Sequence, residues 1–454
     1  MTLAHSPARS PFFVWSGLVL LTALMAVWPL QHSIALRYLL LGLSLIWSVT
    51  GWLAYGSRRE AGRLPLLVPW SLLLLTVWMY VQAFGWALAP DKVLSEIGGQ
   101  WLMTLLSFVI GLSAAYLLPQ QRRLLARLLF VVLAVNVWAL VGLDLVHWLQ
   151  HGSLMRRYGG LESINPLAFA DDSPDKANYV TNIYFAFLLA ELVLRRAGRG
   201  MLGLGYASIA AFFAVGLLAT YIEDMRNGIA ALGLMVLLTV ALLITVAPRA
   251  RRGRETVFAV LILLLGAIPL GYLVSHQERW QTLMATVPIA LDTQHNREWL
   301  IGGEPRLPDG QLASASNYQR IAWAKEAWVV LLHNPLGVGY QRQAFGYGVD
   351  ALYQTDIAHG MHSHSGILDL ADGVGIPGLI LWVTFVVATW FSALTAFRRR
   401  LIAPAAFALL IMFDFSARSV VDSIFRDHMW QQFMFLAGFF ANWGAIEAHR
   451  GEDA

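Results

Sequence analysis

The chain alternates long apolar segments with short polar connectors along its whole length. The apolar runs are roughly 20 residues long, which is what an α-helix needs to cross about 30 Å of hydrocarbon. A backbone exposed to lipid must satisfy its own hydrogen bonds, so the pattern predicts an all-α polytopic membrane protein with about twelve spans. The expected spans are 11–30, 34–55, 64–89, 99–118, 124–149, 177–195, 201–222, 227–247, 255–275, 376–397, 401–417 and 429–447.

Composition supports this class and excludes others. Of 454 residues, 57% are hydrophobic and 13% are charged, which is too apolar for a soluble protein. The absence of cysteine excludes disulfides and thiolate metal sites. The apolar run from Phe12 to Leu30 is too long for a cleavable signal peptide, so we expect an uncleaved first span.

Arginines mark every second connector. An excess of Lys and Arg in short connectors is typical of the cytoplasmic side, so we expect these connectors and both termini to lie there. Because the positive charge gathers beside the spans, it does not indicate nucleic-acid binding. The clusters are Arg58, Arg59 and Arg63; Arg122, Arg123 and Arg127; Arg195, Arg196 and Arg199; Arg249, Arg251, Arg252 and Arg254; and Arg398 to Arg400.

The opposite face carries the long connectors, above all residues 276–375. We expect one domain over 1–454, with this long loop folded on its outer face. Any chemistry would then lie outside or within the membrane, where nucleotide-activated substrates are not normally present. A donor carried across the membrane on a lipid is the natural alternative.

One segment of the long loop, YQRIAWAKEAWVVLL, has a helical pattern. Ser316-x-x-Gln319 is a capping-box pattern at its start, and Pro335 predicts its end. Its apolar residues fall on one face, opposite Arg320 and Lys325, so the helix would lie on the membrane surface or cover a cavity. These apolar residues are Ile321, Ala324, Trp328 and Leu331.

Arg226 lies in the short connector between the seventh and eighth expected spans, YIEDMRNG. Such a short turn holds it near the bilayer boundary. A guanidinium there can grip phosphate oxygens with two parallel hydrogen bonds, which suits a lipid diphosphate. It can equally pair with Glu223 and Asp224 as an interfacial arginine. Both readings are open from the spacing alone.

Three histidines, His359, His362 and His364, fall within six residues. A neutral histidine, with an ordinary pKa of about 6.5, can accept a proton from a hydroxyl at neutral pH. The spacing does not match a zinc pattern such as His-Glu-x-x-His, so we expect no metal. A structural role is the alternative for each of the three.

Polar residues and glycines follow the histidines. Asp369 and Asp372 can orient a histidine or cap the next helix, and Gly375 and Gly378 permit close packing where that helix begins. For four more polar residues near outer span ends, capping and cavity lining are both open. They are Asp144, Asn178, Asn182 and Asp414.

Two segments carry a family resemblance. His364-Ser365, nine residues and Gly375-Ile376-Pro377-Gly378 resemble the pattern His-[Asn/Ser/Gln]-x9-Gly-x-x-Gly. The segment Arg320–Tyr340 resembles a Trp…Asn-Pro-Leu-Gly-x-Gly motif. Through these two segments the chain resembles the O-antigen ligase family of the Wzy/WaaL-type polytopic membrane glycosyltransferases. This resemblance implies a GT-C-like fold.

The resemblance implies transfer of a polysaccharide from undecaprenyl diphosphate to a hydroxyl of the lipid A-core oligosaccharide, at the periplasmic face of the bacterial inner membrane. It implies inversion, no metal and no cofactor, with His364 as general base. It also implies an essential arginine at Arg226, where Met225-Arg226-Asn227 stands for the usual Ser-Arg-Gly. Further substrate-binding candidates are Arg156, Arg157, Arg320, Arg342, Arg418, His362 and Asp369.

Three other functions remain open at this stage. A polymerase of the same superfamily would extend the lipid-linked glycan, although the histidine–glycine pattern favours a ligase. Protein O-oligosaccharyltransferases tend to be longer. A transporter would place its polar residues at mid-membrane on interrupted helices, whereas here they gather at the outer ends of the spans.

Overall fold

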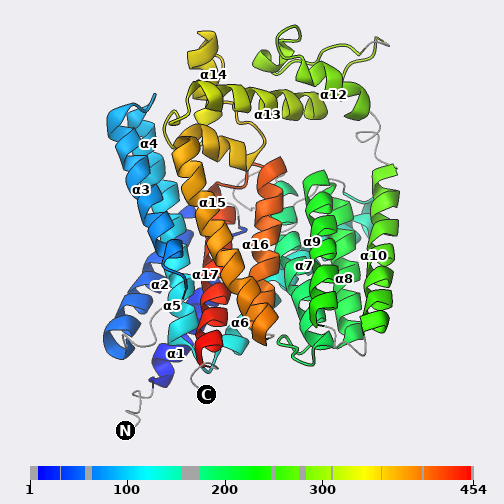
Figure 1. Cartoon of the computed structure of the whole chain (residues 1–454). Coiled ribbons are helices and arrows are strands. Elements are labelled where there is room, and N and C mark those ends of the chain that lie inside the picture. Colours follow the sequence, from blue (N-terminus) through cyan, green and yellow to red (C-terminus); the bar gives the residue numbers. More distant parts are fainter. Residues whose placement is uncertain are drawn as a thin grey trace.

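The computed structural model is a bundle of long helices closed at one end by a layer of short helices (Figure 1). The helices run at moderate angles to one another, and α1 begins and α17 ends at the end opposite the layer. No strand occurs in the part of the chain that the structure describes. That part comprises residues 9–30, 32–56, 64–155, 174–246, 252–275, 283–307, 310–358, 360–400 and 403–450.

Each expected span coincides with a helix. Nine helices among the described residues are long and apolar enough to cross a membrane, which confirms the all-α polytopic class; the number twelve stays a prediction. The bundle helices are α1 Pro11–Val27, α2 Ile34–Tyr55, α3 Leu67–Gly85, α4 Pro90–Glu96, η1 Ile97–Trp101, α5 Leu102–Leu117, α6 Arg122–His151, α7 Pro174–Arg196, α8 Tyr206–Glu223, α9 Arg226–Val246, α10 Arg252–Ser275, α15 Gly366–Arg400, α16 Ala403–Val421 and α17 Asp427–Arg450.

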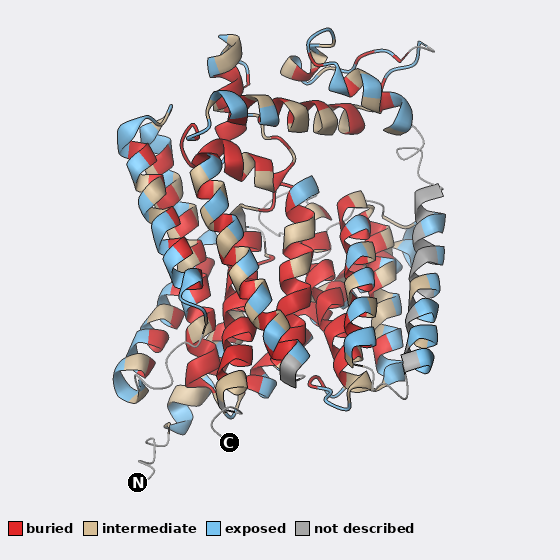
Figure 2. Cartoon of the chain, in the orientation of Figure 1, coloured by how far each residue is buried: buried red, intermediate tan, exposed pale blue. Residues whose placement is uncertain are grey.

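The centre of the bundle consists of α7, α16 and α17, which are buried on almost every side, whereas α2, α3 and α10 lie outside (Figure 2). Aromatic rings bind α15 to this centre. Trp382 of α15 meets Trp430 of α17 edge-on at 5.4 Å, and within the centre Phe415 of α16 and Phe433 of α17 stack with their ring centroids 3.8 Å apart. Such rings bury large areas and fix their mutual orientation, so the outer end of α15 has a rigid support.

The layer at the other end has its own small core. It comprises α12 Leu283–Leu291, the 3-10 helix η4 Glu298–Ile301, α13 Ala315–His333 and α14 Ala344–Tyr353. Trp299, Tyr318 and Phe345 are fully buried in this core. The longest helix of the layer, α13, lies across the end of the bundle above α9 and α16 (Figure 1). The structure therefore favours the cavity-covering reading of the amphipathic segment.

The predicted capping box at the start of α13 is wrong. The helix begins at Ala315 with Ser314 at the N-cap position. The Ser316 hydroxyl instead accepts a hydrogen bond from Arg226, and the Gln319 side chain donates to the carbonyl of Gly302. Both side chains bind residues that are distant in the sequence, and a local sequence pattern cannot reveal such partners. The predicted end of the helix before Pro335 is confirmed, since α13 ends at His333.

The predicted faces of α13 are also wrong. Of its four apolar positions only Leu331 is buried in the core of the layer. Ile321 and Ala324 pack against that core but are only partly buried, and together with Trp328, Arg320 and Lys325 they line one cavity. The side of α13 that carries Tyr318 and Ala322 packs into the apolar core of the layer, and the side that carries Arg320 and Lys325 lines the cavity.

The helix α15 is broken at Gly375, where φ is 67° and ψ is −178°. A side chain there would be strained in this conformation, and a Cβ atom would lie 2.2 Å from the carbonyl carbon of Leu336. The loop after α13 fits into the break: Val338 N donates to Asp372 O at 2.9 Å, and Ile376 N donates to Pro335 O at 2.8 Å. The two motif segments of the sequence therefore meet here.

Side chains of α3 satisfy the carbonyl groups that this break exposes. Trp78 Nε1 donates to Val374 O at 2.6 Å, and Gln82 Nε2 donates to Leu336 O at 2.5 Å. An unpaired carbonyl at this depth would cost the free energy of a lost hydrogen bond, because lipid offers no donor. The break is thus a stable feature that directs residues 366–374 back under the layer.

Candidate active site

Arg226 begins α9 directly below α13. Its Nη1 donates to Asn317 Oδ1 at 2.6 Å, and its Nη2 donates to Ser316 Oγ at 3.1 Å. In the opposite direction, from α13 to α9, Arg320 Nη1 donates to Asn227 Oδ1 at 3.1 Å. The two guanidinium groups thus cross between the bundle and the layer, and each is held by polar neighbours in a fixed position.

His364 lies where the loop after α14 enters α15. Its backbone adopts the left-handed conformation with φ of 57°, which is uncommon for a residue with a side chain. The imidazole stacks on the Trp323 ring at 5.2 Å, with 13° between the planes. The His362 ring meets it nearly edge-on at 4.3 Å. The strained backbone and these two rings together fix where the imidazole points.

The surroundings keep both imidazoles neutral. Burial, helped by His362, Arg320 and Arg426, lowers the pKa of His364 to about 3. Burial also lowers the pKa of His362, and the nearby Asp369 carboxylate opposes that shift. A buried imidazole surrounded by cations loses its proton easily. Each ring is therefore uncharged at neutral pH and has a nitrogen lone pair available to a hydrogen-bond donor.

A cavity of about 590 Å³ lies between α9, α13 and the histidine loop. Arg226, Arg320 and His364 all line it, and no carboxylate is among its described lining residues. Much of the remaining surface is apolar. The apolar lining residues are Ala230, Leu283, Leu291, Ile321, Ala324, Trp328, Val420 and Val421.

A second, smaller cavity of about 240 Å³ lies on the other side of the histidine pair. His362 and Arg342 line this cavity, so the structure separates Arg342 from Arg226 and Arg320. Asp369 also lines it. The His362–His364 pair lies between the two cavities, since His362 lines the smaller one and His364 lines the larger one.

The carboxylates of this loop neither orient a histidine nor cap the helix through a hydrogen bond. Asp369 Oδ1 accepts from Ser363 N at 2.7 Å, and its Oδ2 accepts from Ser423 Oγ at 2.6 Å. Asp369 therefore ties the histidine loop to the connector before α17. Asp372 is buried, and neither of its carboxylate oxygens has a hydrogen-bond partner among the described residues.

Arg418 does not line either of these cavities. It is fully buried; its Nη2 donates to Asp422 Oδ2 and its Nη1 to Asn178 Oδ1, both at 2.8 Å. Asn178 in turn donates to Glu223 at 2.6 Å. Since Asp422 O also accepts from the backbone of Gly366, this network supports the start of α15. The placement favours a positioning role over direct contact with substrate.

The other open polar residues have structural partners. Asn182 donates to Asp414 Oδ1 and to the carbonyl of Gly228, and Asp144 accepts from the backbone of Met155. Two substrate-binding candidates, Arg156 and Arg157, and the third histidine, His359, lie outside the described residues.

Sequence reasoning did not single out three residues of the site. Trp323 stacks on His364, whereas Gln341 and Arg426 line the smaller cavity. Trp323 and Gln341 lie in or beside the second motif segment, which is the only local signal for them. Among the described residues, no group of three or more His, Cys, Asp or Glu side chains could hold a metal ion.

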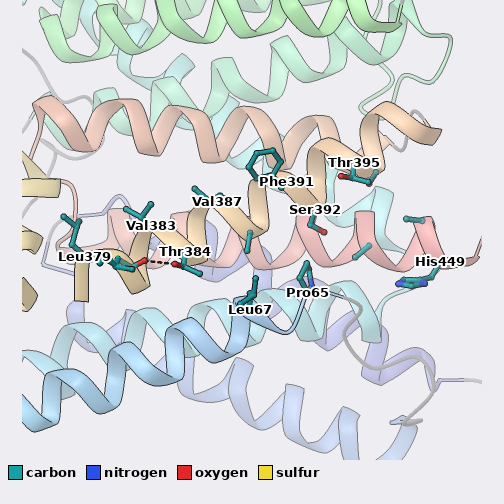
Figure 3. A pocket seen from close by; sticks show the side chains of 15 residues that line it. Pro65, Leu67, Leu379, Val383, Thr384, Val387, Phe391, Ser392, Thr395 and His449 are labelled. Carbon is teal, nitrogen blue, oxygen red and sulfur yellow. Dashed lines mark hydrogen bonds between the residues drawn. The ribbon is translucent and has the colours of Figure 1, made fainter. Parts of the chain in front are cut away.

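A larger groove of about 820 Å³ lies elsewhere, along α15 between α3 and α17 (Figure 3). Leu379, Val383, Val387 and Phe391 line its length, and His449 closes one end. The described residues that line it include neither a cation cluster nor a histidine pair. Its apolar surface at span level suits a lipid chain rather than chemistry, so size alone does not identify the site.

Residues 209–383 match the family model described as O-Antigen ligase. The match runs from α8 into α15 and includes Arg226, the whole described layer and the histidine loop. A search of curated proteins finds no match. The family resemblance predicted from the two motif segments is confirmed.

Proposed function

We propose that this chain, which belongs to the O-antigen ligase family through residues 209–383, transfers a polysaccharide from undecaprenyl diphosphate to a hydroxyl of the lipid A-core oligosaccharide. The reaction takes place at the periplasmic face of the bacterial inner membrane, with both chain ends in the cytoplasm. One observation carries the proposal: His364, Arg226 and Arg320 line one cavity whose remaining surface is largely apolar.

The lining of this cavity suits a lipid diphosphate donor. Arg226, Arg320 and Lys325 supply three cations, and no carboxylate is among the described residues that line the cavity, which favours a dianionic head group. Leu283, Leu291 and the other apolar residues suit the first isoprene units of the tail. A guanidinium binds a diphosphate through two parallel hydrogen bonds, whereas an ammonium acts as a point charge.

The transfer is a single displacement at the anomeric carbon. The acceptor oxygen forms a bond to that carbon while the bond from the carbon to the phosphate oxygen breaks, which inverts the configuration. The acceptor hydroxyl gives its proton to a ring nitrogen of His364, and undecaprenyl diphosphate leaves with the bonding electrons. A positioned base of this kind typically contributes a 10²–10⁴-fold rate increase. Positioned cations stabilise the departing charge by ~3–4 kcal/mol for each well-placed donor.

The decisive experiment compares His364→Ala with His333→Ala, a change at an exposed histidine at the end of α13. Both variants are purified and given lipid-linked polysaccharide and lipid A-core. We expect His364→Ala to lose transfer while it inserts and binds donor, and His333→Ala to match the unmodified protein. Near-normal transfer by His364→Ala would contradict the proposed base.

A gene deletion separates the ligase from the polymerase. Long lipid-linked polymer together with bare lipid A-core supports the ligase. Loss of polymer length would instead show that the chain is the polymerase of the same superfamily.

Addition of a chelator to the purified assay tests the expected metal independence, which a strict requirement for a divalent cation would overturn.

A further inference from the structure

We infer that the smaller cavity, on the His362 side of the histidine pair, binds one uncharged sugar ring of the acceptor, and that Gln341 determines which ring it accepts. This inference rests on the proposed transfer reaction. It names the part of the acceptor that the protein recognises, and it assigns the two substrates to two separate cavities.

The size of the cavity sets the first limit on its ligand. Its volume of about 240 Å³ is less than half of the 590 Å³ beside it. Pockets for drug-sized ligands span about 300–1,000 Å³, so this one suits a smaller group such as a single sugar ring. An isoprenoid diphosphate needs both more volume and more apolar surface.

Gln341 gives the second indication. Its side chain lines the cavity with only 6% of its surface exposed, and neither Nε2 nor Oε1 has a hydrogen-bond partner among the described residues. Buried polar groups are normally paired, so an orphaned amide facing a cavity indicates a missing polar ligand. The amide offers two donors and an acceptor, which matches adjacent sugar hydroxyls, since each of these can donate and accept.

The charges that line the cavity indicate a neutral ligand. Arg342 and Arg426 are balanced by Glu96 and Asp369. Two cations and two carboxylates give no net attraction for an anion, whereas Arg226, Arg320 and Lys325 line the larger cavity with no carboxylate among its described lining residues. Arranged around a small space, they instead act as strong hydrogen-bond partners for hydroxyl groups. Further polar lining residues are Tyr38, Ser95, Gln100 and Ser423.

The His362–His364 pair places the proposed sugar site next to the reacting groups. His362 faces the smaller cavity and His364 faces the donor cavity, with their rings 4.3 Å apart. A hydroxyl that projects from the bound ring past His362 therefore reaches His364 and the donor. Tyr38 lines the same cavity and is 43% exposed, which marks the side where the rest of the acceptor continues outward.

The test measures the KM for each substrate separately in Gln341→Leu, which keeps the volume of the side chain but removes its hydrogen bonds. We expect the KM for lipid A-core to rise about tenfold or more, because a lost hydrogen-bonding pair is worth about a factor of ten. The KM for the lipid-linked donor should stay the same. The matched control is Gln319→Leu in α13, whose side chain lines neither cavity and bonds only to Gly302 O.

A binding measurement separates this inference from the proposed function. Soluble, delipidated core oligosaccharide is titrated into the inactive His364→Ala protein and into the double variant with Gln341→Leu. Binding that is present in the first and at least tenfold weaker in the second supports the inference. Equal binding in both, or a rise only in the donor KM, would overturn it while leaving the ligase assignment intact. If Gln341→Leu fails to fold in detergent, Gln341→Glu takes its place; it keeps an acceptor and removes the donors.

Discussion

The two cavities beside the histidine pair differ in size, polarity and charge. The larger cavity, beside His364, is mostly apolar and is lined by three cations, whereas the smaller cavity is polar and balanced in charge. One suits a lipid with an anionic head, and the other suits a neutral ring with many hydroxyls. Under the proposed function, this difference keeps the two substrates apart while their reacting atoms meet at the histidine pair.

The hydrogen-bond and ion-pair partners of the arginines differ between the larger cavity and the buried network of Arg418. An arginine inside a membrane protein is costly unless polar groups surround it. Arg226 donates to Asn317 and Arg320 donates to Asn227, and both of these amide side chains are neutral. Arg418, in contrast, is paired with Asp422 and has no net charge to offer a ligand. The residues around an arginine therefore decide whether it binds substrate or supports the fold.

The strongest test of this comparison is Arg226→Ala against Arg426→Ala, one cation from each cavity. We expect Arg226→Ala to lower kcat by about 10²–10³-fold, because removing one donor to a developing charge typically costs that much. Arg426→Ala should mainly raise the KM for the acceptor. Both constants are measured with purified protein, with Arg306→Ala in the exposed part of the layer as control. Equal losses of kcat in both variants would show that the cavities are not specialised.

A second test addresses the histidine pair. Trp323→Ala removes the ring on which His364 stacks, so the imidazole gains freedom and we expect kcat to fall about 10–100-fold with both KM values little changed. Trp323→Phe keeps an aromatic face and should recover most of the activity. If Trp323→Ala and Trp323→Phe behave alike, stacking does not position the base.

The smallest expected effect concerns pH. Because the pKa of His364 is lowered to about 3, the free enzyme keeps its base neutral far below pH 6.5, and the acid limb of log kcat/KM should lie well below that pH. His362→Ala removes one of the groups that lower this pKa, so the limb should move to higher pH. An acid limb near pH 6.5 that His362→Ala leaves in place would contradict this.

The free energy of unfolding should also depend on the protonation of His364. An unfolded histidine binds its proton near pH 6.5, whereas folded His364 does so only near pH 3. Between these values the unfolded chain holds more protons, so the free energy of unfolding contributed by this residue falls as the pH falls.

Much of the fold could be predicted because it depends on local properties. Apolar runs placed a helix at every expected span, and the short connector before Arg226 placed that residue at the bundle end below α13. The end of α13 at His333 followed from the Pro and Gly residues after it. The capping box failed because Ser316 has a stronger partner, Arg226, 90 residues away.

The sequence by itself determined the class of the protein and its helices, and it suggested part of the candidate site but not Trp323, Gln341 or Arg426. Order along the chain fixes which end of a span a residue occupies, because each crossing reverses direction. Only the tertiary structure decided which cavity each residue faces: His364 with Arg226 and Arg320, His362 with Arg342, and Arg418 with neither. The face that a side chain turns to depends on packing between distant helices and on the break at Gly375, and no local pattern encodes either.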